Sequence, residues 1–309
     1  MIIYYPMLGL LALTVALSSC ALSPLAKRSA AFGNAATVVV RDSSNAYDTV
    51  ERVTYQTGVS FLVLDFDRSG FDRSKIKPFL SIHDLESRQR LLRGLQVYAE
   101  GLADVAGTSA LVTVDDHSKT LSEALVKLSD NAELKSVFPA ANESTVKGIA
   151  TAIDTLAKIL IERKRRKELP NIVGKMETVL ERLCGLFDED IGTRPENGHS
   201  GRGLRNQLWN EYDNLIGNQT DYIAISNSRL TPAEKASEIA KLPQLVSQQQ
   251  SADAALAATQ RALRQLVITH RALVQSTDDS SFRSRLYELI GDGEEIAAFY
   301  SSLQTKGKN

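Results

Sequence analysis

Asp65, Asp67 and Ser69 carry side-chain oxygens at alternate positions and are followed by Gly70. Calcium-binding loops begin in this way, because alternate residues of a turning chain place their oxygens around one ion. The last ligand of such a loop is a bidentate glutamate, whereas that position here holds Ile76. We therefore name Asp65, Asp67 and Ser69 as the metal candidate of the chain, although the missing ligand favours a polar turn that ends a helix.

A glycine-rich segment, Gly198-His-Ser-Gly-Arg-Gly203, comes closest to a catalytic motif. A nucleophile elbow needs a glycine two residues after its serine, and Arg202 stands there instead. A dinucleotide-binding loop is excluded because Asn206 occupies the third glycine position. We predict an exposed loop over 192–203, no catalytic residue and no cofactor. The four histidines lie far apart in the sequence, without metal-ligand spacing: His83, His117, His199 and His270.

The strongest run of charge consists of five consecutive cations: Arg163, Lys164, Arg165, Arg166 and Lys167. Five adjacent side chains point around a helix in all directions, so they form a surface patch and not part of a core. The preferred interpretation is a solvated helix end, since cations are favourable near a helix C-terminus and Pro170 follows. The alternative is contact with anionic lipid head groups or with peptidoglycan.

Cys20 follows an uncharged apolar run and the small residues Ser18 and Ser19. The apolar run is shorter than the ~20 residues of a membrane-spanning helix and has the length of a signal-peptide core. Leu17-Ser18-Ser19-Cys20 resembles the lipobox of bacterial lipoproteins, over residues 1–20 only. The resemblance implies removal of residues 1–19, acylation of Cys20 and membrane lipid as a partner. The lack of Lys or Arg before the apolar run departs from the pattern, and the alternative is an uncleaved anchor or a cysteine that stands there by chance.

The residue after the lipobox cysteine is Ala21. In Gram-negative lipoproteins an aspartate there marks inner-membrane retention, so the resemblance implies the periplasmic face of the outer membrane. The second cysteine, Cys184, is then left without an intramolecular disulfide partner. Its neighbours Leu180, Leu183 and Phe187 predict a buried, inert thiol.

The composition is that of a globular helical protein. Hydrophobic residues make up 43% of the chain and charged residues 24%, which is enough to build a core. The formal net charge of -1 gives no general attraction to nucleic acid, so no nucleic-acid partner is expected. Helix-forming residues dominate over aromatic and β-branched ones.

Apolar spacing predicts a series of helices. Thr231-Pro232-Ala233-Glu234 has the residues of a capping box and opens the longest one. Its middle, residues 248–255, is polar and rich in alanine, which is typical of a coiled-coil-like surface helix. The expected helices cover about 46–66 (with a strand over 59–66 as the alternative), 81–107, 121–128, 144–191 divided or bent at Pro170, 204–216, 231–276, and 281–303 with a break at Gly291 and Gly293.

These elements predict an all-α fold, an elongated antiparallel helical bundle with long, partly coiled-coil-like helices. The expected organisation is a signal peptide over 1–19, a lipidated tether over 20–34, and a bundle domain over 35–305 that could divide near 192–203.

We expect a membrane-anchored periplasmic lipoprotein with a structural or protein-interaction role in the cell envelope, together with an envelope protein partner. Its expected contact surfaces are residues 252–274 and the basic run. The alternative is a helical enzyme or ligand carrier whose site cannot be read from the sequence.

Overall fold

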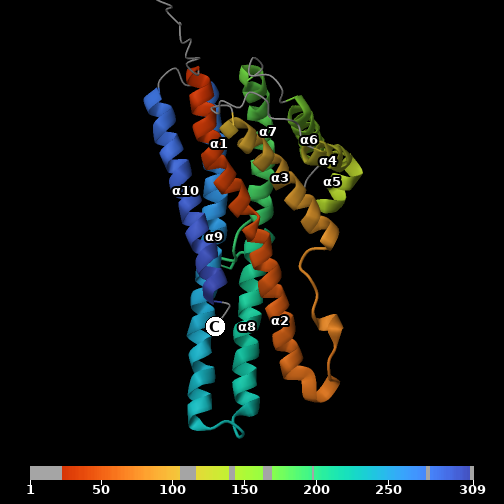
Figure 1. Ribbon diagram of the computed structural model, residues 1–309. Coiled ribbons are helices and arrows are strands. Elements are labelled where there is room, and N and C mark those ends of the chain that lie inside the picture. Colours follow the sequence, from red (N-terminus) through yellow and green to blue (C-terminus); the bar gives the residue numbers. More distant parts are fainter. Residues whose placement is uncertain are drawn as a thin grey trace, which may run out of the picture.

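A computed structural model describes residues 23–104, 116–138, 143–162, 169–196, 198–275 and 279–306, and within these ranges all regular elements are helices (Figure 1). The predicted all-α helical bundle is confirmed. The elements are α1 (Pro24–Ser43), α2 (Asn45–Ser69), the 3-10 turn η1 (Arg73–Lys75), α3 (Ile82–Asp104), α4 (Asp116–Leu128), α5 (Asn131–Val137), α6 (Glu143–Glu162), α7 (Leu169–Ile191), α8 (Gly203–Ser226), α9 (Pro232–Gln275) and α10 (Asp279–Lys306).

One part of the molecule, which we call the main bundle, consists of α1, the first half of α2, α3, α7, α10 and the second half of α9. The helices α4, α5 and α6 pack on its side, against α3 and α7. Its core contains the largest fully buried side chains of the described residues, among them Phe32, Tyr47 and Phe187. Helices that bury so much apolar surface are stabilised mainly by packing and only secondarily by their intrinsic propensity.

Helix α1 overturns the predicted tether. Residues 24–34 form its first half, capped by the Ser23 hydroxyl, which accepts a hydrogen bond from the Ala26 amide at 3.2 Å. Phe32 is fully buried, and a Cβ on Gly33 would lie 2.4 Å from the Ala99 carbonyl oxygen of α3. The tether prediction is therefore wrong for residues 24–34, because alanines and Phe32 give this polar-looking segment a core-facing side. Residues 20–22 lie outside the described residues.

The second part, which we call the distal arm, comprises the end of α2 with the chain after it (60–81), the end of α8 with the following turn (215–231), and the start of α9 (232–248). Helix α8 packs against both α2 and α9, while α2 and α9 contact each other little. In Figure 1 these segments extend below the main bundle, at the end opposite residue 23. Helix α9 alone spans about 66 Å at 1.5 Å per residue and belongs to both parts.

Most helix boundaries agree with the capping signals of the sequence. Helix α2 ends at Ser69, and Gly70 adopts a left-handed φ of 65°, so the predicted break is confirmed and the strand alternative for 59–66 is wrong. The Ser81 hydroxyl caps α3 by accepting from the Asp84 amide. At α9 the Thr231 and Glu234 side chains bond each other's amides, as a capping box requires.

Residues that often break helices do not interrupt α9 or α10. Helix α9 continues through Pro243, and α10 continues through Gly291 and Gly293, so the predicted break in α10 is wrong. Glycine costs only about 1 kcal/mol in a helix interior. In α10 that cost is outweighed by the packing of Leu289 and Ile296, which are fully buried on either side.

Candidate functional site

The distal arm contains a groove of about 380 Å³ between α2, α8 and α9. It runs over α8, because α2 and α9 flank that helix without closing over it. This volume is within the range of small-molecule sites in proteins. The lining residues are Ser60, Val63, Leu64, Leu215, Asn218, Gln219, Tyr222, Glu238, Lys241, Gln244, Leu245 and Gln248.

Part of the polar lining is already bonded. Asn218 Nδ2 donates to Ser60 Oγ at 2.7 Å and so joins α8 to α2. Gln219 Nε2 donates to the Glu238 carboxylate at 2.9 Å, and Lys241 Nζ lies 2.6 Å from the same carboxylate. Hydrogen bonds from Lys241 and Gln219 lower the pKa of Glu238, so this carboxylate is charged and neutralised at pH 7.

The rest of the polar lining is free to bind. Within the described part of the chain, the side chains of Tyr222, Gln244 and Gln248 make no hydrogen bond to protein. Two amides and a phenol are neutral donors and acceptors. Together with the apolar side chains of Leu215 and Leu245, these groups could bind an uncharged amphipathic partner surface. None of the three is a typical nucleophile or general base.

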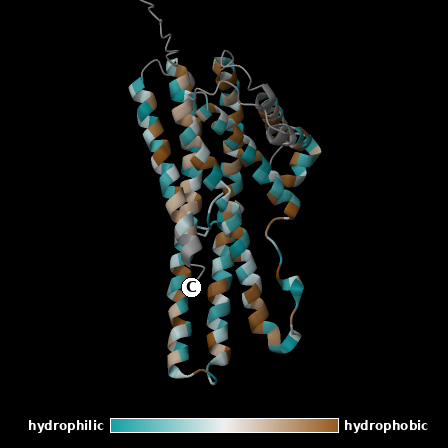
Figure 2. Cartoon of the chain, in the orientation of Figure 1, coloured by the Kyte–Doolittle hydropathy of each residue, from teal (hydrophilic) through white to brown (hydrophobic). Residues whose placement is uncertain are grey.

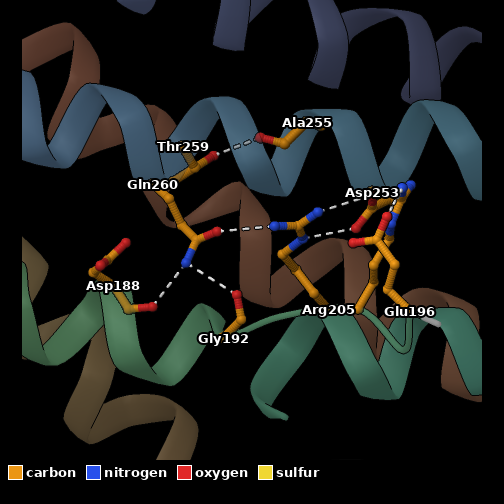
Figure 3. Close-up of polar contacts among 9 residues, drawn as sticks. Asp188, Gly192, Glu196, Arg205, Asp253, Ala255, Thr259 and Gln260 are labelled. Atoms are coloured by element: carbon orange, nitrogen blue, oxygen red, sulfur yellow. Dashed lines mark hydrogen bonds and ion pairs between the residues drawn. The ribbon is translucent and has the colours of Figure 1, made fainter. Parts of the chain in front are cut away.

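A second polar group joins the second half of α9 to the end of α7 and to the start of α8 (Figure 3). Gln260 of α9 points at the end of α7, where its Nε2 donates to the carbonyl oxygens of Asp188 at 2.9 Å and Gly192 at 3.0 Å. It thereby satisfies carbonyls that a helix end leaves without partners. Arg205 of α8 donates to both carboxylate oxygens of Asp253, at 2.7 and 3.0 Å. The side chains of Arg205, Asp253 and Gln260 are all bonded to one another or to the backbone, which indicates that this group holds the helices together.

A third group of polar side chains, inside the main bundle, is also fully hydrogen-bonded. Arg88 is 4% exposed and donates to both carboxylate oxygens of Asp190, at 2.8 and 2.9 Å. The Tyr47 hydroxyl donates to the same carboxylate at 2.7 Å, and the guanidinium carbon of Arg88 lies 4.5 Å from the centre of the Phe138 ring. Burial and the Asp190 charge raise the pKa of Tyr47 well above its usual value. These residues hold α2, α3, α5 and α7 together.

Two further titratable groups of the core are unreactive. Burial lowers the pKa of His270 to about 4, so the imidazole is neutral at pH 7, and its Nε2 lies 2.9 Å from the Tyr98 hydroxyl. Burial raises the pKa of Cys184 to about 12. The prediction that Cys184 is buried is confirmed, and a thiol with this pKa is protonated at neutral pH.

The structure contradicts the calcium candidate. Asp65, Asp67 and Ser69 lie in the last turns of α2 and not in a loop, because the helix continues to Ser69. The Asp65 carboxylate pairs with Lys75 and Arg68, and the Ser69 hydroxyl donates to the Asp65 carbonyl oxygen. Two cations therefore occupy the place of the metal. Among the described residues no group of three or more acidic, histidine or cysteine side chains could hold a metal ion.

The predicted contact surface at 252–274 is also wrong. Ala252, Ala255 and Leu263 are fully buried in the main bundle, and Asp253 is occupied by Arg205. The alanines that suggested a surface helix are buried instead, because their small side chains let neighbouring helices approach closely. Cys20 and the basic run Arg163, Lys164, Arg165, Arg166 and Lys167 lie outside the described residues.

The remaining sequence candidates stay apart. His83 pairs with Glu133 at 2.7 Å, whereas His270 lies inside the main bundle and His199 lies in the loop before α8. That loop folds back on itself through pairing of Thr193 with Arg202. The groove in the distal arm was missed by sequence reasoning. Its one sequence signal is the spacing of Gln244 and Gln248, four residues apart on the groove-facing side of α9.

None of the described helices combines the length and apolar character needed to cross a bilayer. Comparison with known proteins adds no relative: the chain matches no protein-family model, no curated protein and no solved structure.

Proposed function

We propose that the protein is a lipid-anchored component of the bacterial cell envelope that holds its distal arm away from the membrane to bind a protein partner. The anchor is acylated Cys20, and the sequence after it favours the periplasmic face of the outer membrane. The role is structural or one of protein interaction, and it requires no catalysis.

The position of the two ends carries this proposal. Helix α1 begins only four residues after Cys20, and its start lies at the end of the main bundle opposite the distal arm (Figure 1). Because α1 begins at Pro24 and packs in the core, little chain is left as a spacer. A lipid on Cys20 would therefore place the main bundle close to the bilayer and the distal arm far from it.

The groove provides the contact. Among the residues that form the distal arm, only Leu62, Leu215 and Asn218 are buried. In the main bundle other helices pack around α9, whereas in the distal arm α2, α8 and α9 keep a side exposed to solvent. A partner helix with a neutral polar face and apolar neighbours would cover Leu215 and Leu245 and bond Tyr222, Gln244 and Gln248.

Site-specific photo-crosslinking in cells tests the contact. A photoreactive amino acid at Gln244, in the groove, is expected to give one discrete adduct. The same amino acid at Tyr287, which is 71% exposed on α10, serves as the control. The adduct should weaken when Leu245 is changed to Asp. An equal pattern of adducts at both positions would count against the groove.

Metabolic labelling with palmitate tests the anchor separately. The full chain is expected to incorporate label and to sediment with membranes, whereas the Cys20→Ser chain does neither. A labelled Cys20→Ser chain would refute acylation at this residue.

A second candidate function rests on the volume and neutrality of the groove, which also suit a small uncharged ligand. If the protein is such a carrier, a bound ligand should contact Tyr222 and Gln248. Their NMR signals should then change when the low-molecular-weight fraction of an envelope extract is added. A change seen only with a macromolecular fraction favours the protein partner.

A further inference from the structure

The exposed phenylalanines of the described chain are concentrated at one place. Phe61, Phe66 and Phe71 are 40%, 57% and 69% exposed, whereas every other described phenylalanine is buried or half-buried. All three lie within eleven residues, at the end of α2 and in the turn after it. We call residues 61–77 the tip. Figure 2 shows hydrophobic stretches on the lower part of α2 and on the chain that follows it.

The tip is held in place by the chain around it. Gly70 turns the backbone after α2 with a φ of 65°, and the Asp65 carboxylate then pairs with both Arg68 and Lys75. Further on, the Glu51 carboxylate accepts the amides of Phe79 and Leu80 at 3.2 and 2.7 Å. These contacts fix the segment against α2 while the rings of Phe66 and Phe71 stay in solvent.

Several cations are close to these phenylalanines in the sequence. The Arg68 side chain is 83% exposed, and Arg73 and Lys77 are exposed as well. The tip also contains three carboxylates, Asp65, Asp67 and Asp72, so its four cations exceed them by one charge. Asp65 is paired with Arg68 and Lys75 and has a lowered pKa, chiefly because of its hydrogen bond from Lys75. The tip therefore presents aromatic rings next to positive charge that its own acidic residues only partly balance.

We propose that the tip binds the surface of a bilayer that contains anionic lipid. Aromatic rings enter the region between head groups and acyl chains, and neighbouring cations attract anionic head groups. The tip lies at the end of α2 and in the chain that follows it, in the lower part of the molecule as drawn in Figure 1. Arg73 and Lys77 supply the charge complementarity, and Phe66 with Phe71 supply the apolar area.

This inference goes beyond the proposed function, which concerns the groove and a protein. Because the tip and residue 23 lie at opposite ends of the molecule (Figure 1), a chain acylated at Cys20 would contact one bilayer through its lipid and a second bilayer through its tip.

Flotation with lipid vesicles tests the tip without the anchor. The described core lies entirely within residues 23–306, so an unlipidated chain that starts at Ala21 retains it. This chain is expected to float with vesicles of phosphatidylethanolamine and phosphatidylglycerol, and more weakly with pure phosphatidylcholine. The Phe66→Ser/Phe71→Ser variant is expected to lose about tenfold or more in apparent affinity. Raised salt should weaken binding of the parent chain.

Matched variants separate lipid binding from a change in folding. Tyr287→Ser/Ile268→Ser removes two exposed apolar side chains outside the tip and should bind as the parent does. Arg73→Gln/Lys77→Gln should lose the preference for anionic vesicles. All variants should keep the parent's circular dichroism and melting temperature, since the changed side chains are exposed. The proposal is overturned if the parent chain does not float with anionic vesicles, or if the Phe66→Ser/Phe71→Ser variant floats equally well. Neither result bears on crosslinking at Gln244, which tests the groove.

Discussion

Helix α9 passes through both parts of the molecule and is a different kind of helix in each. Between residues 252 and 273 it lies among α1, α7 and α10, and nine of its apolar side chains are buried. Between residues 232 and 248 it lies beside α8, and none of its residues is buried. The buried residues of the second half are Ala252, Ala255, Leu256, Ala258, Ala262, Leu263, Leu266, Ala272 and Leu273.

The difference shows where the free energy of folding is concentrated. The main bundle combines close helix packing with polar groups that are bonded to one another, such as Arg88 with Asp190. The distal arm leaves Tyr222, Gln244 and Gln248 unbonded and keeps Phe66 and Phe71 in water. Regions with few buried apolar contacts open locally at low cost and are where binding surfaces are found. The following changes test this contrast.

The largest expected effect comes from breaking the buried ion pair of the main bundle. Asp190→Ala leaves the Arg88 guanidinium buried without its carboxylate, which should cost about 3–5 kcal/mol of unfolding free energy. The measurement is the midpoint of urea unfolding. Asp65→Ala removes a half-buried carboxylate whose arginine partner, Arg68, lies in solvent, and it should shift the midpoint far less. Equal shifts would mean that the two parts do not differ as described.

A cavity should also cost more in the main bundle than in the distal arm. Leu263 is fully buried, so Leu263→Ala should lower the unfolding free energy by about 2–5 kcal/mol. Leu245 on the same helix is half-buried in the groove, and Leu245→Ala should cost about 1 kcal/mol. Denaturant titration of the two variants compares one substitution in two surroundings. A larger effect at Leu245 would show that the groove is better packed than the structure indicates.

His270 should make the main bundle sensitive to acid. Its pKa is lowered from 6.5 to about 4 by burial, so the unfolded chain binds a proton at a pH where the folded chain does not. Stability should therefore fall as pH decreases from about 6.5 to about 4, by roughly 3 kcal/mol in total. Unfolding free energies of the parent and of His270→Gln across this range give the difference. Parallel pH curves for the two proteins would contradict the prediction.

The smallest expected effect concerns the cap of α9 in the distal arm. Thr231→Ala removes the hydroxyl that bonds the Glu234 amide and should cost about 1 kcal/mol of local stability. Hydrogen exchange should accelerate at the amides of residues 232–240 and stay unchanged over 252–273. Acceleration over both ranges would indicate that the two halves of α9 open as one unit.

Much of the secondary structure follows from local rules. Ser81, Gly70 and the Thr231-Glu234 pair mark helix ends because capping groups satisfy backbone amides within a few residues. Gly291 and Gly293 misled the prediction, since local propensity suggested a break that long-range packing of α10 overrides. Residues 24–34 misled it for the same reason: Lys27 and Arg28 suggested a solvated segment, whereas Phe32 places it in the core.

The candidate site was less accessible from the sequence. Asp65, Asp67 and Ser69 have the spacing of a calcium loop, but the same alternation within a helix spreads their side chains apart, and Lys75 occupies the carboxylate. The groove combines residues of α2, α8 and α9 that are separated by up to 188 positions, from Ser60 to Gln248. No local pattern connects them. The predictions at Cys20 and at residues 163–167 stay predictions.

The sequence by itself determined the helical class, most helix ends and the buried state of Cys184, because each depends on spacing within one or two helical turns. The tertiary structure alone decided which half of α9 is enclosed and which half is open. The reason is physical: an alanine-rich, polar helix can serve either as the centre of a bundle or as its surface, and only the helices that pack against it determine which one it becomes.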